Sequence, residues 1–267
     1  MEDIFHFRKF SVLNGESGQK VGTDGVLLGA ATDLSFLQEA RILDIGTGTG
    51  LIALMLAQRL EQMQKKAEIT AIEIDPAAAD RASRNFGASP WSGMLQCLPV
   101  SLECYADNLY RDPGIDVESS SGAPGTAGRF DLIVSNPPFY DNYLQSPDSA
   151  RATARSTGSL SYREIITFAS DFLTPEGRLA LILPKDEQQR LVRFAASFGL
   201  FPLSILSIRT TVAKTAKRII AEFSRTKGKT AVRTLTMQEA DGSFTDEYLA
   251  LTADFYLRVA SPRSSSR

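Results

Sequence analysis

The fold is decided by the stretch ILDIGTGTGLIALMLA, residues 42–57. It reads as an apolar strand that ends at Ile45, a glycine loop, and a helix rich in alanine and leucine. Gly46, Gly48 and Gly50 have no Cβ, so the backbone of the loop can approach a ligand closely and turn sharply into the helix. A strand, a glycine loop and a helix in this order predict an α/β domain with a ligand at the carboxyl end of the strand.

The spacing of these glycines narrows the choice of ligand. Gly-x-Gly-x-Gly behind a strand-borne acid, Asp44, differs from the Gly-x-Gly-x-x-Gly of dinucleotide-binding proteins. An acid just ahead of the loop repels a phosphate but attracts a cationic amino acid, such as the methionine part of S-adenosylmethionine. We therefore predict that Asp44, Gly46, Gly48 and Gly50 bind this cofactor.

Two further strands point toward the same ligand. Glu73 lies near the end of the expected strand 68–74, about twenty residues past the glycines, where a carboxylate accepts hydrogen bonds from ribose hydroxyls. A third strand is expected within residues 94–100, and its end faces the same crevice of a doubly wound sheet. The predicted cofactor contacts therefore also include Glu73, Ile74, Ser101 and Leu102.

Residues 1–30 are the predicted lid or cofactor segment. Phe5–Val12 alternates aromatic and polar residues, which predicts a short strand packed by one face. Residues 20–30, KVGTDGVLLGA, begin with turn residues, and Thr23 or Asp24 can cap a helix there. A plain capped helix is the alternative interpretation. Our candidate cofactor ligands in this segment are Lys20, Thr23 and Asp24.

The candidate catalytic loop is SNPPFY, residues 135–140, directly after the apolar strand 130–134. Pro137 and Pro138 have fixed φ and no N–H, so their carbonyls point outward as acceptors. Asn136 adds a side-chain oxygen, and Phe139 supplies a flat face. Two acceptors beside an aromatic plane suit a planar group with an exocyclic NH₂, either adenine or a glutamine amide. The alternative is a proline turn that merely closes the strand.

The rest of the chain completes one α/β domain, residues 1–260. Strands and helices alternate, and the last two strands follow without a long helix between them. This order predicts a Rossmann-like, mostly parallel seven-stranded sheet that ends in an antiparallel hairpin, with helices on both faces. Residues 112–128, rich in Ser and Gly, are expected to be a flexible insertion, and residues 261–267 a disordered tail. The remaining expected strands are 178–183, 203–209 and 218–223, and the remaining expected helices are 77–85 with Asp75 as its cap, 161–172 with a capping box, 187–198 and 244–257.

Composition excludes several classes of protein. The chain has 267 residues, 43% of them hydrophobic, and a net charge of −2. It has no apolar run of the roughly 18 to 20 residues that cross a bilayer and no signal-peptide pattern, so we expect a cytoplasmic protein. Cys97 and Cys104 lack metal-ligand spacing, and His6 is the single histidine, which argues against a metal site and against a Ser-His or Cys-His triad.

A nucleic-acid partner would need a local basic patch, because the net charge is slightly negative. Residues 210–233 carry seven basic residues and one acid, Glu222, and the polar stretch 141–160 contains two arginines at the mouth of the expected site. A solvated face is the alternative for such a run. The candidate RNA-binding residues are Arg151, Arg155, Lys214, Lys217, Arg225, Lys227 and Lys229.

Four blocks together resemble a known enzyme family. Residues 20–30 (KVGTDGVLLGA), 54–59 (LMLAQR), 89–91 (SPW) and 136–139 (NPPF) resemble the bacterial valine-tRNA adenine-N6 methyltransferases, within the class I S-adenosylmethionine-dependent methyltransferases. The glycine loop and Asn-Pro-Pro-Phe are shared by many methyltransferases, and the other three blocks are more discriminating. The similarity runs from Phe7 to Leu257.

The resemblance implies methylation of the adenosine immediately 3′ of the anticodon in one valine tRNA. It places Asp44, Gly46, Gly48 and Glu73 against the cofactor, and residues 136–139 against the target base. Ser101 stands where an Asp is expected at the end of the third strand, which puts its contact with the cofactor's adenine in doubt. The Ser- and Gly-rich insertion is a second departure.

The resulting mechanism is one of positioning, because the cofactor's methyl group is already activated. Asn136 and the Pro137 carbonyl would accept the two amino protons of the base while Phe139 stacks on it, and no general base is needed. We expect the enzyme to act as a monomer. The alternatives are a glutamine methyltransferase of release factors, whose helical N-terminal domain has no counterpart in the residues before Ile42, and a catalytically silent RNA-binding module. A nicotinamide dehydrogenase is disfavoured by the glycine spacing.

Overall fold

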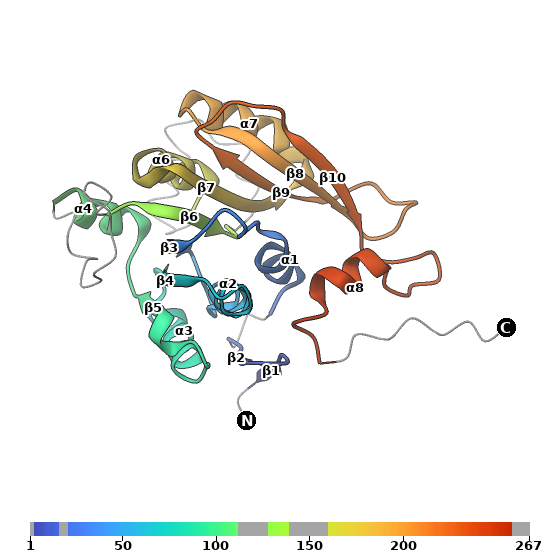
Figure 1. The fold of residues 1–267 in the computed structure, drawn as a ribbon, viewed down its shortest axis with the longest axis horizontal. Helices are drawn as coiled ribbons and strands as arrows, with labels where there is room; N and C mark the ends of the chain where they lie inside the picture. The colour runs from blue at the N-terminus through green and yellow to red at the C-terminus, as the bar shows by residue number, and fades with distance from the viewer. Residues whose placement is uncertain (1–2, 16–20, 112–127, 139–159, 258–267) are drawn as a thin grey trace.

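The computed structural model describes residues 3–15, 21–111, 128–138 and 160–257 (Figure 1). The expected insertion, apart from Gly128, and the expected tail lie outside these residues. The centre of the fold is an eight-stranded sheet in the order β10-β8-β9-β7-β6-β3-β4-β5. Its strands are β3 (Glu39–Ile45), β4 (Lys66–Ile72), β5 (Leu95–Leu98), β6 (Phe130–Ser135), β7 (Leu173–Pro184), β8 (Phe201–Arg209), β9 (Arg218–Ser224) and β10 (Ala231–Thr236).

The topology confirms the expected sheet and adds one strand. β5, β4, β3, β6 and β7 pair in parallel, and β9 runs antiparallel between β7 and β8. The predicted seven strands become eight because β10 pairs in parallel with β8 at the sheet edge. Ala231, Val232, Arg233 and Thr234 of this strand are exposed, so it lacks the apolar alternation that would have identified it in the sequence.

Helices cover both faces of the sheet, as predicted. α1, α2, α3 and α8 contribute to one buried cluster, and α4, α6 and α7 contribute to a second (Figure 1). α4 was not predicted. The helices are α1 (Thr23–Ala31), α2 (Leu51–Gln62), α3 (Pro76–Gly87), α4 (Leu102–Arg111), α6 (Tyr162–Phe172), α7 (Gln188–Ser197) and α8 (Asp246–Thr252), and the short 3₁₀ turns are η1 (Ser92–Met94) and η2 (Lys185–Glu187).

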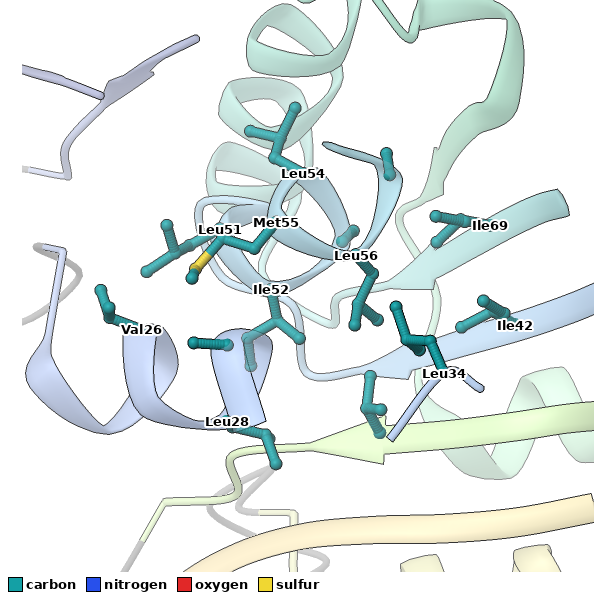
Figure 2. Close-up of a cluster of buried hydrophobic side chains, with 14 of the residues drawn as sticks. Val26, Leu28, Leu34, Ile42, Leu51, Ile52, Leu54, Met55, Leu56 and Ile69 are labelled. Atoms are coloured by element: carbon teal, nitrogen blue, oxygen red, sulfur yellow. The ribbon is translucent and has the colours of Figure 1, made fainter. Parts of the chain in front are cut away.

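α1 packs closely against α2 because α1 has small residues at the contact. Figure 2 shows Val26 of α1 beside Leu51, Ile52 and Met55 of α2. A Cβ added at Gly29 would lie 2.9 Å from two side-chain atoms of Met55, closer than real Cβ contacts. The glycine in the block KVGTDGVLLGA therefore allows the two helices to approach, which fixes α1 next to the helix that follows the glycine loop.

The predicted helix starts are partly confirmed. α6 has the predicted capping box, in which Ser161 accepts from the Glu164 N–H and the Glu164 side chain accepts from the Ser161 N–H. Asp75 caps α3 by accepting from the Ala77 N–H. The predicted cap of α1 is wrong, because Gly22 is the N-cap and makes no side-chain hydrogen bond.

The N-terminal segment forms two strands where one was predicted. β1 (Ile4–His6) and β2 (Ser11–Leu13) pair antiparallel as a separate small sheet. The turn between them packs the Phe7 ring against Phe10 and Tyr256, and the Arg8 N–H donates to the Phe255 carbonyl. The aromatic residues that suggested one strand therefore serve a hairpin that joins the two ends of the described chain. No helix in the described part is both long and apolar enough to cross a membrane.

Candidate active site

The carboxyl ends of four parallel strands meet at one edge of the sheet, which we call the carboxyl edge. Ile45 of β3 is in register with Ile72 of β4 and with Ser135 of β6, and Ile72 is in register with Leu98 of β5. The residues that follow these strands therefore lie side by side. This edge brings together the glycine loop, Glu73 and Asn136, which are far apart in the sequence.

The glycine loop has a backbone that only glycine adopts easily. Gly46, Gly48 and Gly50 have φ of 69°, 59° and 82°, so each lies in the left-handed region. Gly50 is the N-cap of α2, and a Cβ there would lie 2.4 Å from the Phe86 ring of α3. The sequence explained these glycines by a close approach of the backbone to a ligand. The structure adds two further reasons: positive φ at all three positions and close packing of Gly50 against Phe86.

Glu73 links the glycine loop to the end of β4. Its Oε2 accepts from the Gly48 N–H at 2.9 Å, and its Oε1 accepts from the Asp75 N–H at 3.0 Å. The side chain is half-buried, and each carboxylate oxygen keeps a second lone pair for a further donor. Glu73 thus both shapes the loop and remains able to accept hydrogen bonds from a ligand.

Asp44 is a fully buried carboxylate under the glycine loop. The Thr47 hydroxyl donates to its Oδ2 at 2.6 Å, and its Oδ1 has no hydrogen-bond partner among the described residues. Burial, with a smaller contribution from the charge of Glu73, outweighs the hydrogen bonds from the Thr47 hydroxyl and the Ala53 N–H and raises the pKa of Asp44 to about 7. An unpartnered buried acceptor is costly, so this oxygen fits a ligand that brings a cationic donor.

The catalytic loop begins at a strand end that is tied to β3. The Ser135 hydroxyl donates to the Ile45 carbonyl at 2.7 Å, directly ahead of Asn136. Asn136 is half-buried, Pro137 is buried and Pro138 is exposed, while the predicted stacking residue Phe139 lies outside the described residues. The hydroxyl of Ser135 therefore sets the position of Asn136 relative to the glycine loop.

The remaining predicted cofactor residues surround this edge. Ser101 accepts from the Cys104 N–H at 3.1 Å, which gives it a helix-capping contact at the start of α4, and Leu102 is the first residue of that helix. Ile74 is 52% exposed, an uncovered apolar side chain next to Glu73. Such a side chain provides a surface on which a flat ring can lie.

The N-terminal candidates lie at the first turn of α1. Thr23 is exposed, and Asp24 accepts from Arg218 of β9 at 2.8 Å. Arg218 pairs with Pro184, the last residue of β7. The first turn of α1, which holds Asp24, therefore lies at the carboxyl edge. The Asp24 carboxylate is thus in an ion pair, whereas Lys20 lies outside the described residues.

Asn85 is a positioning residue that the sequence did not reveal. It lies 2% exposed on the inner face of α3. Its Nδ2 donates to the Thr49 carbonyl at 2.8 Å, and its Oδ1 accepts from the Leu13 N–H at 2.8 Å. Asn85 therefore connects the glycine loop to β2. A polar residue among the buried alanines of a helix was the one available signal.

The basic run is divided between two ends of the sheet. Lys214 and Lys217 lie in the turn between β8 and β9, at the carboxyl edge. Arg225, Lys227 and Lys229 follow the far end of β9, away from Asn136. Arg151 and Arg155 lie outside the described residues.

A cavity of about 410 Å³ lies apart from the glycine loop, beside the end of α1 and strands β7 to β10. Most of its charged side chains have hydrogen-bond or ion-pair partners within the protein. Arg59 donates to the Gly29 and Thr32 carbonyls at 2.9 and 2.7 Å, and Arg178 forms an ion pair with Asp33 at 2.7 Å. Glu222, 5% exposed, accepts from the Asp33 N–H at 2.8 Å.

In the described part of the chain, no group of His, Cys, Asp and Glu could hold a metal ion.

Solved structures with a similar fold are methyltransferases. A predicted O-methyltransferase from Agrobacterium tumefaciens superposes with a TM-score of 0.57 at 21% identity, covering 86% of this chain and 96% of that chain. The 16S rRNA N2 G1207 methyltransferase of T. thermophilus superposes with a TM-score of 0.51 at 19% identity, covering 85% of this chain and 50% of that chain. These similarities confirm the predicted fold class.

Curated relatives match the chain almost from end to end, although no family model matches it. A protein of Bacteroides fragilis (strain YCH46) is 37% identical over 97% of this chain and 99% of its own length. A Flavobacterium psychrophilum protein is 38% identical over 96% of this chain and all of its own length, and a Porphyromonas gingivalis protein is 40% identical over 95% of each. All three are named tRNA1(Val) (adenine(37)-N6)-methyltransferase, and this chain therefore belongs to that family, as its sequence motifs predicted.

Proposed function

We propose that this chain transfers a methyl group to the N6 amino group of adenosine 37 in tRNA1(Val), the reaction for which its relatives are named. The methyl donor is S-adenosylmethionine. One observation carries the proposal at the level of the site. The Asn136-Pro137-Pro138 loop starts directly beside the glycine loop, held there by the hydrogen bond from Ser135 to Ile45. An amino-group acceptor and a cofactor loop thus share one edge.

Three side chains fit the parts of the cofactor. The unpartnered Oδ1 of buried Asp44 suits the ammonium group of the methionine part, and Glu73 can accept from the ribose hydroxyls. The exposed Ile74 suits one face of the adenine. The cofactor supplies an activated methyl group, so these residues need only bind and orient it.

The catalytic loop orients the amino group of the target base. The Asn136 side-chain oxygen and the Pro137 carbonyl would each accept one amino hydrogen, which directs the nitrogen lone pair toward the methyl group. The base must leave its stack to reach the loop, at a cost of a few kcal/mol that is smallest in a single-stranded anticodon loop. The nitrogen loses its proton after transfer, so no histidine or other tuned base is required.

The test is methyl transfer from labelled cofactor into total tRNA, rRNA and protein, followed by nucleoside analysis. The proposal expects label in N6-methyladenosine of tRNA. Label in a protein glutamine without label in tRNA would replace the proposal with the alternative predicted from the same loop. A catalytically silent module would bind cofactor, measured by calorimetry, and label none of the three.

Substitution at the loop tests the mechanism. Asn136→Ala is expected to lower kcat roughly 100-fold or more, since it removes an acceptor used in the transition state, and to leave cofactor affinity near wild type. Asn108→Ala, at an exposed position of α4, is the matched control and should retain full activity. Near wild-type methylation by Asn136→Ala would exclude this role.

The proposal includes action as a monomer in the cytoplasm. A single chain supplies the glycine loop, Glu73 and Asn136, so the site residues named here need no second copy. Sedimentation of the active enzyme with and without tRNA tests this part. A dimer that loses activity on dilution would contradict it.

A further inference from the structure

The basic run 210–233 contains two pairs of lysines, and strand β9 separates one pair from the other. Lys214 and Lys217 precede β9, whereas Lys227 and Lys229 follow it. The steps along the strand from Lys217 to Arg225, at about 3.3 Å each, add up to roughly 25 Å. The two groups therefore lie at opposite ends of the sheet, and a ligand held at Asn136 lies near only the first.

The lysines at the carboxyl edge are close to the catalytic loop across the sheet. β9 is separated from β6 by one strand, β7. Neighbouring strands lie about 4.8 Å apart, and Arg218 lies three residues beyond Ala221, which is level with Ser135 through Leu181. The start of β9 is therefore roughly 14 Å from the end of β6. Lys217 is also held to the residue that follows β7, since the Lys185 N–H donates to its carbonyl at 3.0 Å.

The backbone under these lysines is fixed while their side chains are exposed. The Lys217 N–H donates to the Ile208 carbonyl at 3.0 Å, and the Lys214 N–H donates to the Thr211 carbonyl at 3.1 Å. Among the described residues, neither ammonium group forms an ion pair or hydrogen bond. Two cations on a rigid turn keep all their donors for an external anion.

The other basic groups nearby are already engaged. Arg218 is paired with Asp24, Lys185 donates to Gln188 and Ser207, and Arg209 donates to Thr236 and Val212. At the far end of β9, Arg225 donates to the Ser170 and Leu173 carbonyls, which is a structural contact. Among the basic groups that the structure describes around this end of β9, the two lysines of the β8–β9 turn are thus the ones without a partner.

Acidic residues bound this positive surface. Asp186 lies next to Lys185 at the end of β7, and Glu239 and Asp241 lie past the end of β10, on the outer side of β8. A polyanion that runs from the catalytic loop to the β8–β9 turn passes Asp186 at the end of β7 and stops short of Glu239 and Asp241, which lie beyond β8. The arrangement gives direction to the bound chain as well as charge.

We propose that Lys214 and Lys217 bind the phosphates of the tRNA strand beside the target adenosine, and that Lys227 and Lys229 make no contact with it. This inference rests on the proposed function, since it takes the RNA as the ligand of Asn136. Of the five candidate RNA-binding residues in the basic run, it keeps the two in the β8–β9 turn.

Two double variants with the same loss of charge test it. Binding of a fluorescent tRNA1(Val) transcript is measured by anisotropy over a series of salt concentrations. For Lys214→Ala with Lys217→Ala, the slope of log K against log salt should fall by about 2, and affinity should fall about tenfold at roughly 0.1 M salt. The KM for tRNA should rise by a similar factor, with kcat and cofactor affinity unchanged.

Lys227→Ala with Lys229→Ala is the matched control and should keep the wild-type slope. Equal slopes for the two double variants, or a larger change in the control, would overturn the inference. Methylation of tRNA by the wild type is measured in the same preparations. Its absence would contradict the proposed function, whereas active wild type with no effect at Lys214 and Lys217 would contradict this inference alone.

Discussion

Asp44 and Glu222 are both buried carboxylates in strands of one sheet, and they differ in what surrounds them. Glu222 accepts from the Asp33 N–H and lies near the positive charges of Arg178 and Arg59. Asp44 accepts from Thr47, has one oxygen without a hydrogen-bond partner in the described part of the chain, and has Glu73 as its charged neighbour. Burial raises the pKa of both.

The comparison shows that burial alone does not mark a functional acid. Glu222 is compensated within the protein, as a structural ion network requires. Asp44 has hydrogen bonds but no opposite charge among the causes that act on it, and its Oδ1 lacks a partner among the described residues, which costs stability and suits a ligand that supplies the missing cation. The two carboxylates should therefore respond in opposite ways when they are neutralised.

The largest expected effect is on cofactor binding by Asp44→Asn. The variant keeps the shape of the side chain and removes its charge, so affinity for S-adenosylmethionine should fall about 100-fold, the size of a charged hydrogen bond. Calorimetric titration measures the loss, and urea denaturation should show stability equal to or above wild type. Unchanged affinity in a folded variant would place the cofactor's ammonium elsewhere.

Glu222→Ala should do the reverse. It leaves the Asp33 N–H without its acceptor and the charges of Arg59 and Arg178 less compensated, at a cost of about 2 kcal/mol in unfolding free energy. Cofactor affinity of the folded variant should equal that of wild type. If Glu222→Ala weakened cofactor binding as strongly as Asp44→Asn, the distinction between a structural and a functional carboxylate would fail.

Of the two carboxylates, only the role proposed for Asp44 could be predicted from the sequence, because it depends on a local pattern. The strand, glycine loop and helix of residues 42–57 lie next to one another in the chain, so Asp44 could be proposed as a cofactor residue from the sequence. Glu73 and Asn136 followed because parallel strands end at one edge. The Glu222 network could not be predicted, since its partners come from the segment after α1, from α2 and from β7, and meet only in the folded chain.

The same reason explains what else the sequence missed. The bond from Ser135 to Ile45 spans 90 positions, and the bond from Asn85 to Thr49 spans 36. β10 is an edge strand with exposed residues, which has no apolar alternation to detect. A charge count of residues 210–233 does not show where each lysine lies. Their separation depends on the direction of β9 in the folded sheet.

The pH dependence of cofactor affinity sharpens the comparison further. The pKa of Asp44 is about 7, so the carboxylate that would bind an ammonium group is lost as the pH falls through that value. Affinity should fall about tenfold between roughly pH 8 and pH 6. Asp44→Asn, titrated over the same range, lacks this component and retains only the titration of the cofactor itself. Identical pH profiles for both proteins would contradict the assignment.

Stability should change with pH in the opposite sense to affinity. Because the pKa of Asp44 is raised in the folded protein, the folded state holds this proton more tightly than the unfolded state does. Its contribution to stability is full at low pH and is lost as the pH rises through about 7. In the absence of cofactor, the wild type should lose about 2 kcal/mol between roughly pH 5.5 and pH 8.5, and Asp44→Asn should lose none of this component.

The smallest expected effect is on Cys97, which reports the charge of Asp44 from β5. Burial, and after it the negative charges of Asp44 and Glu73, together raise the pKa of the Cys97 thiol to about 12. In the native protein at pH near 8, exposed Cys104 should therefore be alkylated before Cys97. Mass spectrometry of the peptides measures the two rates. Asp44→Asn should speed alkylation of Cys97 roughly threefold, the effect of about half a pKa unit, and leave Cys104 unchanged. Glu222 is not among the charges that act on Cys97, so Glu222→Ala should not alter the alkylation rate of Cys97 in the folded protein. An equal increase in both variants would mean that the substitutions loosen the whole fold.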